Sequence, residues 1–117
     1  FKYSNLRVSP RQIPATGKVM VSVDVENSGK RAGDEVVQFY VHDVACSVKR
    51  PSKELRGFER VALRPGQKKT VTFALPGEKL SFWDVKTHGF IVEPGAFEVL
   101  VGSSSEDIRL QSRIEVK

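Results

Sequence analysis

Apolar and polar residues alternate along most of this 117-residue chain. The clearest example is residues 18–26, KVMVSVDVE, in which four valines fall on one face and the intervening residues on the other. Successive side chains of a β-strand point to opposite faces, so a period of two indicates a strand with one buried face. We therefore predict a half-buried strand over residues 18–26.

The rest of the chain repeats this pattern. Residues 35–43, EVVQFYVHD, are apolar on both faces, which fits a central strand. Shorter alternating segments cover residues 58–63, 69–75, 80–84, 90–92, 96–101 and 108–116. No window carries an apolar stripe of helical spacing over the length of a helix. The pattern predicts an all-β fold, an immunoglobulin-like or fibronectin type III-like β-sandwich of seven to eight antiparallel strands.

Three Pro-Gly pairs mark turns in the second half of the chain: Pro65-Gly66, Pro76-Gly77 and Pro94-Gly95. Proline fixes φ at the first central position of a type II turn, and glycine accepts the positive φ of the second. The first pair joins two alternating segments. We therefore predict that Lys53–Leu75 form one β-hairpin, with Val61 facing Val71.

Length and composition fit a single folded domain, residues 1–117. The apolar fraction is 39% and the charged fraction 28%, both ordinary for a globular protein. A chain of this length can bury a core of its own. No apolar run approaches the roughly 20 residues that span a bilayer, so no membrane partner is expected. The first residue is Phe1 and no leader pattern is present, so we expect a module cut from a larger polypeptide.

Positive charge is concentrated between residues 49 and 69. The net charge of the chain is +5, and this segment sets eight basic residues against Glu54 and Glu59. The candidate polyanion patch comprises Lys49, Arg50, Arg56, Arg60, Arg64, Lys68 and Lys69. Such a cluster can bind an anionic polymer, or it can be only the solvated face of two strands. Nucleic-acid surfaces interleave aromatic side chains with basic ones. Only Phe58 does so here, and its alternation with Val61 predicts that it points inward, so nucleic acid is not an expected partner.

The chain shows no constellation for catalysis. Its acidic residues fall in turns or on outward strand positions, not as the converging pair that glycoside hydrolysis needs. His42 and His88 are 46 positions apart and Cys46 is the only cysteine, so no metal site is predicted. A phosphate cradle would require a glycine-rich loop that opens a helix. We predict no catalytic residue, no metal and no cofactor.

Trp83 is a candidate ligand platform. Aromatic rings stack on sugars, and Phe82-Trp83-Asp84 places neighbouring aromatic residues on opposite strand faces. The alternative is that Trp83 packs in the core or against a partner domain, because tryptophan is highly buried on average.

Three strings carry a family resemblance: VSVDVENSGKRAGDEVVQFYV, PSKELRGFERVALRPGQKKTVTFAL and EPGAFEVLVGSSSEDIRL. Together they closely resemble the C-terminal fibronectin type III-like domain of family 3 glycoside hydrolases, the β-glucosidases and their relatives. The resemblance covers nearly the whole chain. It implies an accessory module of a parent enzyme that hydrolyses terminal β-D-glucosyl residues from oligosaccharides, with both catalytic residues in other domains. The family's Ser-Asp-Trp nucleophile motif does not occur here, so no catalytic residue is carried over.

The resemblance implies that the partners of this module are the catalytic domains of the same polypeptide. The candidate contact segment comprises Pro51, Lys53, Glu54, Leu55 and Phe58. This hypothesis predicts an exposed apolar patch on the domain alone. The alternative is a binding module for cell-wall polymer. It would bind glycan through Trp83, or an anionic polymer such as lignin through the basic segment.

Overall fold

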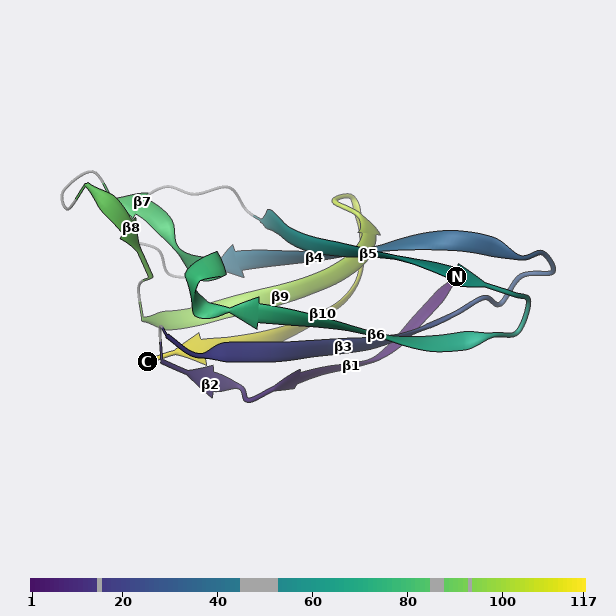
Figure 1. The fold of residues 1–117 in the computed structure, drawn as a ribbon, viewed down its shortest axis with the longest axis horizontal. Coiled ribbons are helices and arrows are strands. Elements are labelled where there is room, and N and C mark those ends of the chain that lie inside the picture. The colour runs from purple at the N-terminus through teal and green to yellow at the C-terminus, as the bar shows by residue number, and fades with distance from the viewer. Residues whose placement is uncertain (15, 45–52, 85–87, 93) are drawn as a thin grey trace.

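The computed structural model describes residues 1–14, 16–44, 53–84, 88–92 and 94–117, with only the backbone of residues 82–84. The molecule is elongated, measuring 54 × 25 × 18 Å, and two sheets are stacked along its length (Figure 1). The predicted all-β sandwich is confirmed. The strong β-propensity of the valine-rich and alternating segments accounts for this architecture.

The smaller sheet has the strand order β1-β3-β6 and the larger one β2-β10-β9-β4-β5. The smaller sheet contains β1 (Lys2–Ser9), β3 (Lys18–Glu26) and β6 (Lys68–Pro76). The larger contains β2 (Gln12–Ile13), β4 (Gly33–Asp43), β5 (Glu54–Leu63), β9 (Gly95–Ser104) and β10 (Asp107–Val116). A 3-10 turn η1 (Gly77–Leu80) leads to a separate ribbon of β7 (Phe82–Asp84) and β8 (Gly89–Ile91). Within the described ranges every strand pair is antiparallel except β2 with β10.

The core lies between the two sheets. The four valines of β3 are fully buried, which confirms the period-two prediction for residues 18–26. Phe39 from β4 and Phe97 from β9 meet them from the larger sheet, each at most 2% exposed. Burial of these side chains is the main stabilising contribution, about 2 kcal/mol for each one fully removed from water.

The predicted hairpin over Lys53–Leu75 is wrong. Strand β5 pairs with β4 in one sheet, and β6 pairs with β3 in the other. The connection is the predicted type II turn, since φ of Gly66 is +76° and the Gln67 N–H donates to the Arg64 carbonyl at 2.9 Å. A type II turn has the wrong twist for a tight hairpin and splays its flanking strands. Here the splayed strands enter opposite sheets, with Val71 in the core and Val61 packed against it.

The other two Pro-Gly pairs do not form type II turns. Pro76 precedes η1, and Gly77 is its first residue. Gly95 has a φ of +138° and begins β9. Pro76 is the N-cap of η1 in an extended conformation, with φ −72° and ψ 151°, which the fixed φ of proline allows.

Side chains bridge the gap between the unpaired edges of β5 and β6. The Lys69 ammonium donates to the Ala62 carbonyl at 3.0 Å. Lys79 of η1 donates to the Arg56 carbonyl at 3.1 Å, and the Arg56 Nε donates back to the Lys79 carbonyl at 2.5 Å. We call these contacts the β5–β6 seam. They hold together two strands that share no backbone ladder.

Candidate interaction surfaces

The outer face of the larger sheet carries an exposed apolar patch. Opposite residues in the β4–β5 register share a face, and the outward ones include Val36, Leu55 and Phe58. Leu55 is 47% exposed, Phe58 66% and Val36 36%. We call these three residues the β5 patch. Large apolar side chains gathered on one face are typical of an interaction site.

A bulge and a glycine turn Leu55 and Phe58 to the same face. Phe39 lies opposite Gly57 and Tyr40 opposite Leu55, so Arg56 is the extra residue of the bulge. Gly57 faces inward, where a Cβ would overlap the ring of Phe73. That ring stacks on Phe39 with 5.0 Å between centroids. Glycine is therefore required at position 57 for the two sheets to close.

The prediction that Phe58 points inward is wrong. Phe58 and Val61 are three positions apart, and a strand places residues at odd spacing on opposite faces. Val61 packs against the core, so Phe58 faces solvent.

Ion pairs flank the β5 patch at both ends. Arg56 pairs with Glu54 at 2.6 Å, and Arg60 binds one Asp34 oxygen at 2.6 and 2.9 Å. Two of the candidate polyanion residues are thus already neutralised by neighbouring carboxylates. An apolar centre with a polar rim is the usual anatomy of a protein–protein interface.

The other candidate contact residues, Lys53 and Pro51, and the candidate ligand platform Trp83 are not among the three residues that define the β5 patch. Lys53 is half-buried and immediately precedes β5. Pro51 lies outside the described residues, as does the side chain of Trp83. The Trp83 backbone pairs with Phe90 in the β7–β8 ribbon, and Phe90 is 71% exposed. Sugar stacking by Trp83 therefore stays a prediction.

The other basic residues gather at the opposite end of β5. Arg64, Lys68 and Lys69 flank the type II turn, whereas Lys49 and Arg50 lie outside the described residues. The loop between β3 and β4 brings Lys30 and Arg31 to the same end, which the sequence reasoning missed. The basic residues are visible in the sequence as Gly29-Lys30-Arg31. They are more than 30 positions from Arg64, so the sequence alone does not show that the two segments lie close together.

Asn27 holds this end together. Its buried amide donates to the carbonyls of Arg31 at 2.7 Å and Leu63 at 3.1 Å. Its backbone exchanges two further bonds with the turn, to Gly66 and Gln67. One side chain and its own peptide thus tie the β3–β4 loop to the β5–β6 turn. We call the two joined loops the basic tip.

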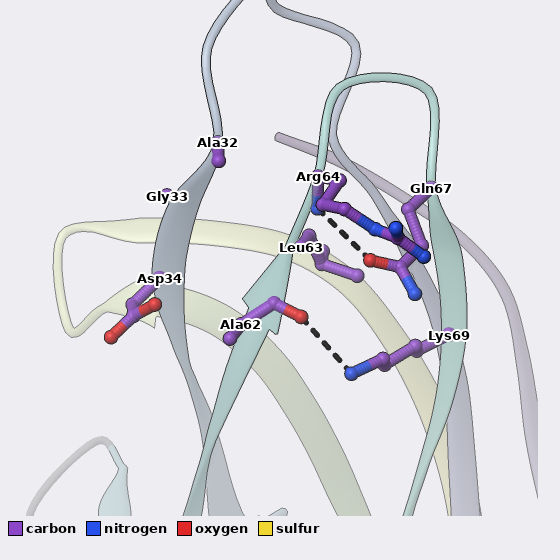
Figure 2. A pocket seen from close by; sticks show the side chains of 8 residues that line it. All are labelled: Ala32, Gly33, Asp34, Ala62, Leu63, Arg64, Gln67 and Lys69. Atoms are coloured by element: carbon purple, nitrogen blue, oxygen red, sulfur yellow. Dashed lines mark hydrogen bonds between the residues drawn. The ribbon is translucent and has the colours of Figure 1, made fainter.

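A cavity of about 360 Å³ lies at the basic tip between the two loops (Figure 2). Its lining includes Arg64 and Gln67 from the turn, Lys69 from β6 and Asp34 from β4. The Gln67 side-chain oxygen accepts the Arg64 backbone N–H at 2.9 Å, which orients the amide.

The outer face of the smaller sheet is polar and internally bonded. Asp24 accepts bonds from Thr70 at 2.7 Å, Asn5 at 3.1 Å and Arg7 at 3.4 Å. The Thr70 hydroxyl, followed by the Asn5 amide, lowers the pKa of Asp24. Ser22 and Thr72 form a cross-strand hydroxyl pair at 3.0 Å.

The remaining perturbed titratable groups belong to a structural cluster at the β9–β10 turn. Arg109 and Ser103 donate to Asp107 and lower its pKa to about 2. Burial raises the pKa of Tyr3, whose ring lies 5.3 Å from the Arg109 guanidinium carbon. Glu35 also acts on both Tyr3 and Arg109, so these groups form a charged network around one aromatic ring.

The described residues also lack the features of a metal site and of a membrane-spanning helix. Over the described residues, no group of three His, Cys, Asp or Glu side chains is placed to hold a metal ion. In the same part of the chain, no helix has the length and apolar character to cross a membrane.

Comparison with known proteins gives one consistent family. The model of the fibronectin type III-like domain matches residues 35–105. The thermostable β-glucosidase B of Acetivibrio thermocellus is 45% identical over 99% of the chain, and a β-xylosidase of Formosa agariphila is 46% identical over 91%. A solved β-glucosidase from Listeria innocua superposes with a TM-score of 0.87 at 40% identity over 99% of the chain. The chain spans only 14–16% of the length of these three proteins.

Proposed function

The chain belongs to the fibronectin type III-like domain family, as found in β-glucosidases, and we propose that it is a non-catalytic domain that packs on the catalytic domains of its own polypeptide. The observation that carries the proposal is the β5 patch. Its three apolar side chains are exposed although the chain has closed its own core.

The partner that covers the β5 patch is inferred from the length of the related polypeptides. The matched segment is only 15–16% of the length of these relatives, so most of each polypeptide lies outside this domain. A partner covalently linked to the domain is present at high effective concentration, so even a small apolar patch suffices for docking. The ion pairs of Arg56 and Arg60 form the rim of the interface, while Leu55 and Phe58 fill its centre.

The chemistry of the parent enzyme is assigned to the other domains. Among the relatives are β-glucosidases and β-xylosidases, so the domain is shared by proteins named for different sugars. A domain that determined sugar choice would be expected to differ between them. We propose hydrolysis of terminal β-glucosyl residues for the parent because several of the relatives are β-glucosidases, with this domain as its structural support.

The test compares Phe58→Asp with Met20→Asp in the full-length parent polypeptide. Met20 is a matched control, because it is 39% exposed on the outer face of the other sheet. We expect Phe58→Asp to destabilise the parent by about 2 kcal/mol, the scale of an interface hot spot, and to shorten the half-life of its β-glucosidase activity on heating. Met20→Asp should change neither.

The same pair in the 117-residue chain separates docking from folding. Because Phe58 is exposed there, its replacement should alter stability by no more than about 0.5 kcal/mol. Equal heat sensitivity of the two full-length variants would contradict the proposal.

A further inference from the structure

The cavity of the basic tip has a lining suited to a ligand. We propose that it is an oxyanion-binding site, which takes a carboxylate or phosphate group through Arg64, Gln67 and Lys69. The site is separate from the β5 patch and does not rest on the docking proposal.

The three side chains offer donors without matching acceptors. The Gln67 oxygen is used by the Arg64 backbone N–H, so its NH₂ group is left as the free end of the amide. Lys69 uses one N–H on the Ala62 carbonyl and retains two. Arg64 contributes a guanidinium whose planar N–H groups match a carboxylate or phosphate. Figure 2 shows these groups around the gap between the end of β5 and the start of β6.

The single carboxylate of the lining does not compete for these donors. Asp34 is bound at 2.6 and 2.9 Å by Arg60, and Figure 2 shows it directed away from Lys69. No described carboxylate forms an ion pair with Arg64 or Lys69. An anion would therefore meet positive charge that is not already neutralised.

The surroundings add long-range attraction. Lys30 and Arg31 are exposed on the β3–β4 loop, and Lys68 is exposed at the start of β6. Clustered charge of one sign raises the local concentration and association rate of an oppositely charged ligand. Asn27 holds the two loops in place by bonding to both, so the site is preorganised.

The position keeps the pocket accessible in a larger enzyme. Leu63, which lines the pocket, lies five residues beyond Phe58 on the same strand, a separation of about 17 Å. A domain seated on Leu55 and Phe58 would leave the donors Arg64, Gln67 and Lys69 exposed, although Asp34 of the lining also belongs to the Arg60 ion pair at the rim of the patch. An acidic sugar at the tip would thus be held away from the docked face.

The test is a titration of the ¹⁵N-labelled 117-residue chain followed by amide chemical shifts. The probes are trigalacturonate, inorganic phosphate and neutral cellotriose, each at low and at high salt. We expect both anions to shift the amides of Gly66 and Gln67, with weaker binding at high salt. Cellotriose should shift neither. Phosphate binding alone would identify a free oxyanion as the ligand, and preference for trigalacturonate would identify an acidic sugar.

Three variants decide whether the pocket is responsible. Arg64→Gln and Lys69→Gln should each weaken anion binding about tenfold, the scale of a charged hydrogen bond. Lys18→Gln removes the same charge from the start of β3, eight residues and about 26 Å from that strand's basic-tip end, and should bind like the wild type. Among the described residues, the Arg64 side chain makes no hydrogen bond or ion pair and only its backbone N–H is bonded, so the Arg64→Gln spectrum should otherwise match the wild type. Absence of anion-induced shifts would overturn the proposal, as would equal losses from Lys18→Gln and Arg64→Gln.

Discussion

The two outer faces of the sandwich differ in how their side chains are satisfied. On the smaller sheet, Asp24 and its neighbours bond to one another, and Ser22 pairs with Thr72. On the larger sheet, Leu55 and Phe58 stand exposed. Both faces belong to one domain and have equal access to water. This difference supports the proposal that the larger sheet, rather than the smaller one, docks on another domain.

The largest effect on the difference between the two outer faces is expected from a substitution at Gly57. Gly57→Val would force a side chain into Phe73 and displace β5 together with its patch. We expect a loss of about 3 kcal/mol in the free energy of unfolding, the upper range for an overpacked core, measured by urea denaturation.

Gly33→Ala is the matched control for Gly57→Val. Gly33 lies on the neighbouring strand, and an added Cβ there would be 3.5 Å from Phe1, an ordinary contact. A Gly57→Val chain as stable as Gly33→Ala would show that β5 can move without cost.

The polar face is tested by Asp24→Ala. This change removes the acceptor for Thr70, Asn5 and Arg7 and should cost about 1 kcal/mol, because the network lies at the surface. The effect should depend on pH, since hydrogen bonds chiefly from Thr70 lower the pKa of Asp24 in the folded chain.

A carboxylate with a lowered folded pKa stabilises the fold above its unfolded pKa of about 3.9. That stabilisation is lost as pH falls through the folded value. The difference between wild type and Asp24→Ala should therefore be full at neutral pH and shrink in acid, as followed by thermal melts over a pH series. A difference that grows in acid would contradict the assignment.

The smallest effect is expected at the rim of the apolar face. Arg60→Gln removes an exposed ion pair with Asp34 and should change the stability of the chain by at most about 0.5 kcal/mol. Calorimetry at low and high salt checks this, with wild type as the reference. A loss above about 1 kcal/mol would mean that the rim, and not the patch, holds β5 in place.

The sequence predicted where strands form better than it predicted which strands pair with each other. The valines of β3 were placed correctly because each residue's face depends only on its neighbours along the chain. The pairing of β5 and β6 was not, because it depends on β4 and β3, which lie elsewhere in the sequence. The type II turn itself argued against a hairpin of β5 and β6, because its twist disfavours a tight hairpin.

The exposure and pairing of the candidate surface residues were predicted only in part. Leu55 and Phe58 were named as contact residues from the resemblance, yet the alternation argument turned Phe58 the wrong way. The basic segment was treated as one patch, whereas neutralisation of Arg56 and Arg60 is visible only in three dimensions. The contribution of Arg31 to the basic tip likewise required the Asn27 bridge, which no local pattern specifies.

The β5–β6 seam has a further consequence, for self-association. An uncovered strand edge is a template on which a second molecule can add a strand, and lysines are among the residues that prevent this. Lys69 and Lys79 occupy carbonyls of β5 that an invading strand would need. We therefore infer that Lys69 and Lys79 help to protect the chain from edge-to-edge aggregation.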